Sequence, residues 1–123
     1  MGEYVEQLNF EKLFVYQKSL IFVDGVYKLS KHFPSDEKYG LTDQLKRASV
    51  SILANIAEGF GRFHEKDMTH FFRVSRSSAY ECIALMQVAQ RQDYLKEDDY
   101  KDMYSKAQEI TRMISGYIKS INK

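Results

Sequence analysis

The chain has 123 residues, of which 44% are hydrophobic and 28% charged, a balance typical of a folded globular protein and not of a disordered one. This length suits one domain, residues 1–123, with a buried core. Eighteen basic and seventeen acidic residues give a formal net charge of +1, which excludes the strongly basic balance of a dedicated DNA-binding domain. Nucleic-acid binding would therefore need a local basic patch.

The single cysteine, Cys82, excludes an intramolecular disulfide and favours a reducing compartment. Residues 1–7 are polar and acidic and lack the apolar segment of a signal peptide. No apolar run approaches the roughly eighteen residues of a membrane span. We expect a cytoplasmic protein of bacterial type that does not associate with membranes.

The first predicted helix covers residues 11–31 and ends before Phe33-Pro34, because proline cannot continue a helix. Two apolar stripes lie along it, roughly 120° apart at ~100° per residue. We assign one stripe to the core: Leu13, Tyr16, Leu20, Val23 and Tyr27. The other consists of Val15, Phe22, Val26, Leu29 and Phe33. Two such stripes indicate either a helix buried on most sides or a subunit interface. We favour the interface and expect an oligomer.

The second predicted helix starts at Thr42, a candidate N-cap residue, and ends at Gly59. Its apolar positions follow helical spacing and are expected to face the core: Leu45, Ala48, Ile52 and Ile56. Small and polar residues are unusually frequent between these positions. A helix of this kind is expected to pack closely between its neighbours.

The third and fourth predicted helices cover residues 64–92 and 97–121 and have unbroken heptad-like spacing. The expected core residues of the third are Met68, Phe72, Ser75, Ala79, Cys82, Met86 and Ala89. Those of the fourth are Tyr100, Met103, Ala107, Ile110, Ile114, Tyr117 and Ile121. Four long helices joined by short loops predict an all-α fold, an antiparallel up-down-up-down four-helix bundle.

Catalytic and metal-binding patterns are weak. The nearest match to a di-iron motif is one copy of Asp67-x-x-His70, where a di-iron bundle needs two Glu-x-x-His repeats. Cys82 occupies a core position and is expected to be a small buried hydrophobe, not a nucleophile. Gly59-x-Gly61 ends a helix, so its neighbours are carbonyls and not the free amides that bind phosphate. We expect no catalytic residue, metal, cofactor or small-molecule substrate, and no enzyme activity.

The second helix carries polar residues on nearly one line: Arg47, Ser51 and Glu58, with Asn55 beside them. Arg47 and Glu58 are about 16 Å apart along a helix, so they cannot pair with each other. Each is expected to find its partner on another helix or subunit. We interpret Asn55 and Glu58 as structural pins that order the helix and its loop, with contact to a ligand or partner as the alternative.

One face of the third helix is basic and carries Lys66, Arg73, Arg76 and Tyr80. Such a face is either simply solvated or binds phosphate backbones, and repetition around a ring of subunits would enlarge it. The candidate residues for contact with nucleic acid or a partner are Lys46, Arg47, Arg62, Lys66, Arg73, Arg76 and Tyr80.

The segment QLKRASVSILANIAEGFGR, residues 44–62, resembles the hallmark of the four-helix bundle proteins encoded in 23S ribosomal RNA intervening sequences. Further similarity lies in residues 10–16, 33–41 and 78–81. That family is similar to the accessory variability determinant of diversity-generating retroelements. The resemblance implies a homopentamer that binds nucleic acid through basic surfaces and associates with a reverse transcriptase.

The sequence therefore leads to two hypotheses for function. The first is an oligomeric binding or scaffold module for RNA, DNA or a nucleic-acid enzyme. The alternative is a structural module whose partner is another protein and which binds no nucleic acid.

Overall fold

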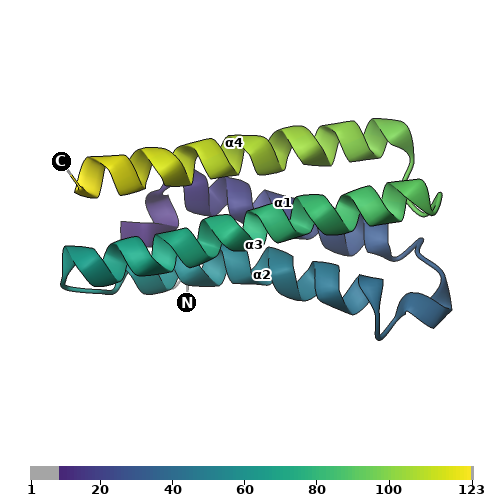
Figure 1. Ribbon diagram of the computed structural model, residues 1–123, viewed down its shortest axis with the longest axis horizontal. Helices are drawn as coiled ribbons and strands as arrows, with labels where there is room; N and C mark the ends of the chain where they lie inside the picture. The colour runs from purple at the N-terminus through teal and green to yellow at the C-terminus, as the bar shows by residue number, and fades with distance from the viewer. Residues whose placement is uncertain (1–8, 123) are drawn as a thin grey trace, which may run out of the picture.

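A computed structural model describes residues 9–122; residues 1–8 and 123, including the N-terminal segment considered above, lie outside the described residues. Four helices run side by side, each antiparallel to the one before it (Figure 1). They are α1 (Phe14–Ser30), α2 (Leu41–Phe60), α3 (Glu65–Arg91) and α4 (Glu97–Ile121), with short 3-10 helices η1 (Asn9–Lys12) and η2 (Ser35–Glu37). The predicted all-α four-helix bundle is confirmed. Among the described residues, the backbones of α1 and α3 do not approach each other, and neither do those of α2 and α4, so the helices form a square with these two pairs on its diagonals.

The core stripes predicted for α2, α3 and α4 face the interior of this square. Ile52, Ile56, Phe72, Met86 and Ile110 are fully buried, and the smaller residues of the same stripes lie between them. Of the predicted core residues on these three helices, only Met68, Tyr100, Tyr117 and Ile121 are partly exposed, and all four pack against the core. The helical period alone thus identified the buried sides of three helices.

The stripe that we assigned to a subunit interface, Val15, Phe22, Val26, Leu29 and Phe33, faces the core, so that prediction is wrong. Of the stripe that we assigned to the core, Leu13 and Tyr16 do pack against it. Phe22 is 0% exposed, Leu29 packs against the core, and the other three side chains are buried in it. Leu20 and Tyr27, which we assigned to the core, are 41% and 42% exposed. The buried stripe also contains Ser19 and Ser30, which made it less apolar in the sequence than it is in space.

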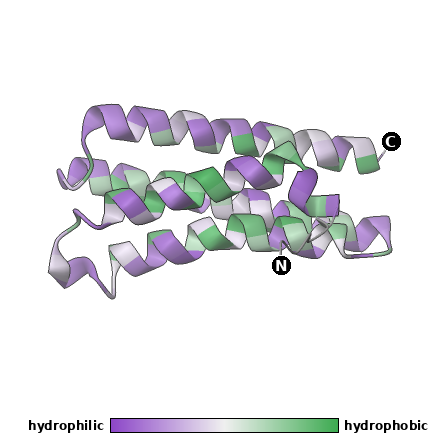
Figure 2. Ribbon diagram, turned by 180° about the vertical axis from the view of Figure 1, so that it is seen from behind, coloured by the Kyte–Doolittle hydropathy of each residue, from purple (hydrophilic) through white to green (hydrophobic). Residues whose placement is uncertain are grey.

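The exposed stripe of α1 continues onto α2. Tyr27 lies on the side of α1 that turns toward α2, where Lys46 contacts its ring, and Leu20 shares that side of the helix. On the outer side of α2, Val50 and Ala54 are exposed and Ala57 is partly exposed. We call Leu20, Tyr27, Val50, Ala54 and Ala57 the α1–α2 apolar surface. Figure 2 views the bundle from this side, with α1 and α2 in the foreground and hydrophobic positions along both ribbons.

The ends of the helices depend on contacts from elsewhere in the chain. The predicted N-cap role of Thr42 is wrong, because α2 starts one residue earlier and the Leu41 backbone amide donates to Glu37 Oε1 at 3.2 Å. The hydroxyl of Tyr94 donates to the other oxygen of Glu37 at 3.4 Å. At the end of α3, Asp93 has a φ of 63°, and the Tyr94 amide donates to the Ala89 carbonyl at 2.9 Å in a Schellman-type cap.

The contact between α2 and α3 is the most extensive between any two helices of the described residues. A Cβ atom placed on Gly59 would lie 2.6 Å from Cε1 of Phe72. The Phe72 ring is buried and packs against Phe60 at 5.0 Å and Tyr117 at 6.3 Å between ring centroids. The ring therefore has no free space into which it could retreat.

We predict that Gly59→Ala destabilises the protein by about 1–3 kcal/mol, because the added methyl group overpacks against Phe72. The loss should exceed the gain in helix propensity, about 1 kcal/mol, that alanine brings to a helix interior. Urea unfolding followed by circular dichroism measures the difference.

Gly116→Ala is the matched control. Gly116 lies within α4, and a Cβ atom there would meet nothing within 4 Å. This variant should gain about 0.5–1 kcal/mol of stability. Equal effects of the two substitutions would contradict the close contact at Gly59.

Candidate functional site

The polar residues of α2 hold that helix to α3. The Ser75 hydroxyl donates to the Ile52 carbonyl at 2.6 Å, and the hydroxyls of Ser51 and Ser78 are hydrogen-bonded at 2.8 Å. Asn55 Nδ2 donates to the Ser51 carbonyl at 2.8 Å and to its hydroxyl at 3.0 Å. Asn55 therefore orients Ser51, and Ser51 joins α2 to α3.

Arg47 and Glu58 find their partners four residues away in the chain, within α2 for Arg47 and just beyond its end for Glu58, and not on another helix or subunit as we expected. Arg47 Nε lies 2.9 Å from Asp43 Oδ2, and Arg62 Nη2 lies 2.9 Å from Glu58 Oε2. Each pair is four residues apart and exposed, a spacing that brings side chains together on a helix surface. Glu58 is consequently paired with a cation at the surface.

Three of the predicted contact residues lie on or next to α2. The Lys46 ammonium lies 4.8 Å from the centre of the Tyr27 ring on α1, and the Arg62 guanidinium lies 4.6 Å from that of the Phe71 ring on α3. Arg47 is directed outward toward Asp43. The structure does not bring Lys46 and Arg47 together with the basic residues of α3.

The basic residues of α3 join others on α4 that the sequence analysis missed. Arg76 Nη1 donates to the Ser115 hydroxyl of α4 at 3.0 Å. Arg112 and Lys119 lie about one turn to either side of Ser115 and are exposed. Lys66 and Arg73 are exposed along the first half of α3, and Tyr80 is exposed near its middle. We call the five cations the α3–α4 basic face: Lys66, Arg73, Arg76, Arg112 and Lys119.

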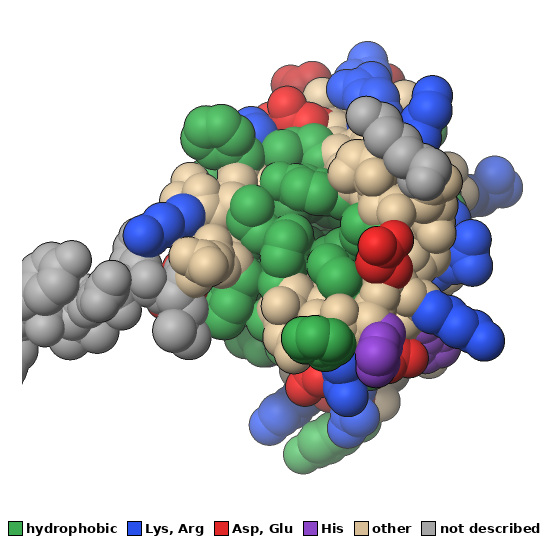
Figure 3. Space-filling model, turned by 90° about the vertical axis from the view of Figure 1, so that its left-hand side faces the viewer, with side chains coloured by type: hydrophobic (Ala, Val, Ile, Leu, Met, Phe, Trp, Pro, Cys, Tyr) green, Lys and Arg blue, Asp and Glu red, His purple; other side chains and the backbone are tan. Residues whose placement is uncertain are grey.

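Acids are scarce along the segments that carry the α3–α4 basic face, where only Glu65 and Asp67 lie beside one of its cations, Lys66. The sequence contains no Asp or Glu from residue 68 to 80 of α3 or from 110 to 123. Within the described residues, Lys66, Arg73, Arg112 and Lys119 form no ion pair. In Figure 3, which looks onto one end of the bundle, basic side chains gather along the right-hand side, where α3 and α4 lie.

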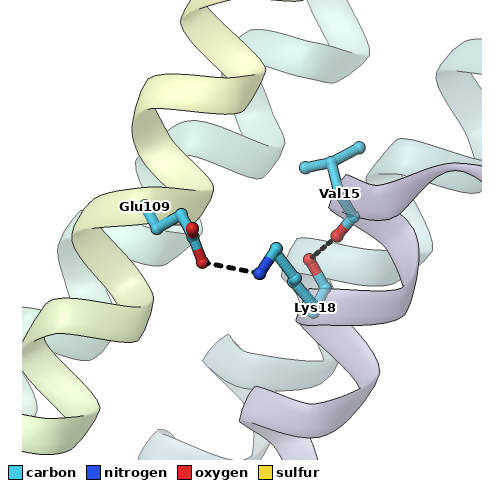
Figure 4. A network of polar contacts seen from close by, with 4 residues as sticks. Val15, Lys18 and Glu109 are labelled. Atoms are coloured by element: carbon cyan, nitrogen blue, oxygen red, sulfur yellow. Dashed lines mark hydrogen bonds and ion pairs between the residues drawn. The ribbon is translucent and has the colours of Figure 1, made fainter.

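The acids of α4 are used elsewhere. Lys18 Nζ of α1 lies 3.0 Å from Glu109 Oε1 of α4 and links the two helices, beside the Ser19 hydroxyl that donates to the Val15 carbonyl at 2.7 Å (Figure 4). Lys106 and Lys101 pair with Asp102 and Glu97 at 2.8 and 3.3 Å. These acids of α4 therefore pair with lysines on the α1 side and in the first turns of α4, away from the α3–α4 basic face.

The remaining chemistry of the molecule is limited. Burial, assisted by the charge of Glu81, raises the pKa of Cys82 to about 12, so this thiol stays protonated near neutral pH. Among residues 9–122, no three His, Cys, Asp or Glu residues gather as a metal site would require. The same residues include no helix with the length and apolar character needed to span a bilayer.

Two neighbouring hollows lie between α1 and the first part of α4. One of about 340 Å³ is lined by His32, Tyr94 and Asp99 among others, and a neighbouring one of about 330 Å³ includes Asp24, Asp102 and Lys106. Partial burial and then the Glu37 carboxylate raise the pKa of the Tyr94 hydroxyl. Acids and bases are mixed in both hollows, and neither contains the cations of the α3–α4 basic face.

A family model described as 23S rRNA-intervening sequence protein matches residues 11–116. A crystal structure of a protein of unknown function from the S23 ribosomal protein family of Bacteroides thetaiotaomicron has a TM-score of 0.79 to this chain. The two are 24% identical, over 85% of this chain and 98% of that chain, which indicates a shared fold. No curated protein matches the chain.

The fold and surface define a small all-α bundle protein with a basic face whose cations form no ion pair among the described residues. Because the family model covers most of its length, the chain belongs to the 23S rRNA-intervening sequence protein family.

We predict that Cys82 of the folded protein does not react with a thiol reagent such as Ellman's reagent at about pH 8. With a pKa of about 12, about one molecule in ten thousand carries the thiolate that attacks the reagent. In urea, the pKa returns toward about 8.5 and the thiol should react fully. Absorbance at the product wavelength follows both reactions. Equal rates with and without urea would contradict the burial of this side chain.

Proposed function

We propose that this protein is a non-enzymatic, oligomeric binding module that contacts nucleic-acid phosphates through the α3–α4 basic face. The observation that carries the proposal is that none of the five cations of this face forms an ion pair within residues 9–122. Unpaired cations are the groups that gain most from a polyanion, because binding releases the counterions condensed on the phosphates.

The size of the face sets the expected strength of binding. Five cations on one subunit give weak contact that falls steeply with salt. Several copies of the face, held in one oligomer, would bind a long nucleic acid with much greater avidity. The function therefore depends on assembly as well as on charge.

The α1–α2 apolar surface is the proposed subunit interface. This proposal takes the place of the interface predicted from the sequence, whose residues are buried in the core. The surface combines Leu20 and Tyr27 of α1 with the small outer residues of α2. Alanine at positions 54 and 57 would allow a helix of a second subunit to approach closely. The homopentamer that the family resemblance implies is the assembly we propose.

A second candidate function is a scaffold whose partner is another protein, such as a reverse transcriptase. The α1–α2 apolar surface favours it, because exposed apolar patches mark protein interfaces. In that case the same surface would hold the partner, and the cations would be simply solvated.

We predict that Arg73→Ala and Arg112→Ala each weaken binding of RNA and DNA at low salt. Each substitution removes one phosphate contact per site, so the slope of log K against log salt concentration should become less steep by about 0.7–0.9 per contact. Fluorescence anisotropy of a labelled oligonucleotide across a salt series measures both quantities.

Lys101→Ala is the matched control, since Lys101 is an exposed cation of α4 that is paired with Glu97 outside this face. It should leave affinity and slope unchanged. Absence of binding by the unmodified protein to either RNA or DNA at low salt would reject this function in favour of the protein scaffold.

We further predict that Leu20→Glu and Val50→Glu reduce the mass of the particle in solution, because a buried charge at the interface is costly. Multi-angle light scattering after size exclusion measures the mass. Val88→Glu is the control, since Val88 is an exposed valine on α3. Assembly that survives both interface substitutions would place the interface elsewhere.

A further inference from the structure

Phe63 lies in the turn between α2 and α3, and its side chain is 92% exposed. The described structure gives this ring one aromatic neighbour, the His64 ring, at 5.3 Å between centroids and nearly perpendicular. A phenyl ring so exposed does not contribute to the core. Its face is open to a flat partner.

The surroundings of Phe63 are cationic and aromatic. Arg62 precedes it, with its guanidinium over the Phe71 ring. Beyond His64, the exposed side chains of Lys66, His70 and Arg73 follow one another on successive turns of α3 over about 10 Å. Figure 3 shows the end of the bundle that contains this turn, where histidine and basic side chains lie close together at the lower right. The α2–α3 turn is thus continuous with the α3–α4 basic face.

The acids near the turn leave this path open. Glu58 is paired with Arg62. Glu65 and Asp67 lie about 100° to either side of Lys66 around the helix axis, so they flank the line that runs from Lys66 to Arg73. A phosphate backbone lying on that line would meet cations first.

We propose that the α2–α3 turn is a stacking platform for an unpaired base, so that the preferred ligand is single-stranded nucleic acid. One base stacks on Phe63 while the following phosphates lie along Lys66, Arg73 and the rest of the α3–α4 basic face. The inference rests on the proposed function and adds the class of nucleic acid to it. In a duplex the bases already stack on one another, so Phe63 gains nothing from a double strand. Every base offers a ring face, so the platform tolerates any sequence.

The test compares Phe63→Ala with the unmodified protein on two fluorescein-labelled probes, a single-stranded oligoadenylate and a duplex of the same length. Phe63→Ala should weaken single-strand binding about ten-fold, as the loss of one stacked base does, and leave duplex binding and thermal stability unchanged. An abasic strand of equal charge, which has no base to stack, should bind Phe63→Ala and the unmodified protein with the same affinity. Oligoadenylate in its ribose and deoxyribose forms separates RNA from DNA as the preferred strand.

Phe63→Trp supplies a direct reporter, because the chain contains no other tryptophan. This variant should retain binding, and stacking of a base should quench its fluorescence. Phe14→Ala is the control, since Phe14 is a second strongly exposed phenylalanine, 71% exposed on α1, that lies outside the basic face. It should leave single-strand binding unchanged.

The outcomes separate this inference from the function on which it rests. If Arg73→Ala weakens single-strand binding and Phe63→Ala does not, the platform is wrong and the basic face remains. Unquenched tryptophan in a bound complex would also overturn the platform. If the unmodified protein binds neither probe at low salt, both proposals fail together.

Discussion

The close approach of α2 to α3 is the constraint on which the rest of the structure depends. Gly59 is required where the Phe72 ring reaches the backbone of α2, and Ser75 donates directly to the Ile52 carbonyl. Two helices at this separation leave room for hydroxyl and amide side chains but not for large ones. The unusual density of Ser, Ala, Asn and Gly in residues 44–62 is therefore a packing requirement. The same contact fixes the rotation of α3, so that the side of α3 that carries the cations points away from α2 and lies next to α4.

Acidic and basic side chains lie on different sides of the bundle, a separation that the overall composition does not reveal. The net charge of +1 conceals the separation, because the acids of α4 lie near its start and toward α1, where Lys18 pairs with Glu109. The charged residues in the last turns of α4 are all cations. Antiparallel packing places these turns against the part of α3 that contains no acid. A nearly neutral protein can thus present a face on which several cations form no ion pair with any residue that the structure describes. Since attraction to a polyanion is local at physiological salt, where charges farther apart than about 8 Å are screened, this face matters more than the total.

Assembly and binding are linked by this geometry. The α1–α2 apolar surface and the α3–α4 basic face occupy opposite sides of the square, because α1 and α3 lie on one of its diagonals and α2 and α4 on the other. Subunits joined through the first side would keep the second free, so each added subunit would contribute one more basic face. The exposed Phe63 lies at the end of the bundle, where neither surface covers it.

The amino-acid sequence by itself determined the four helices, their approximate ends, the buried sides of α2, α3 and α4, and the family through residues 44–62. It also located Arg73 and Arg76, because a helical face can be read from local spacing. Tertiary structure decided what depends on neighbours. Both stripes of α1 have helical spacing, and only the positions of α2 and α4 select Phe22 over Leu20 for the core. Arg112 and Lys119 joined the basic face because Ser115 packs against Arg76, a contact between residues far apart in the chain. Periodicity shows which residues share a side of a helix, but the direction in which that side points is set by the other helices.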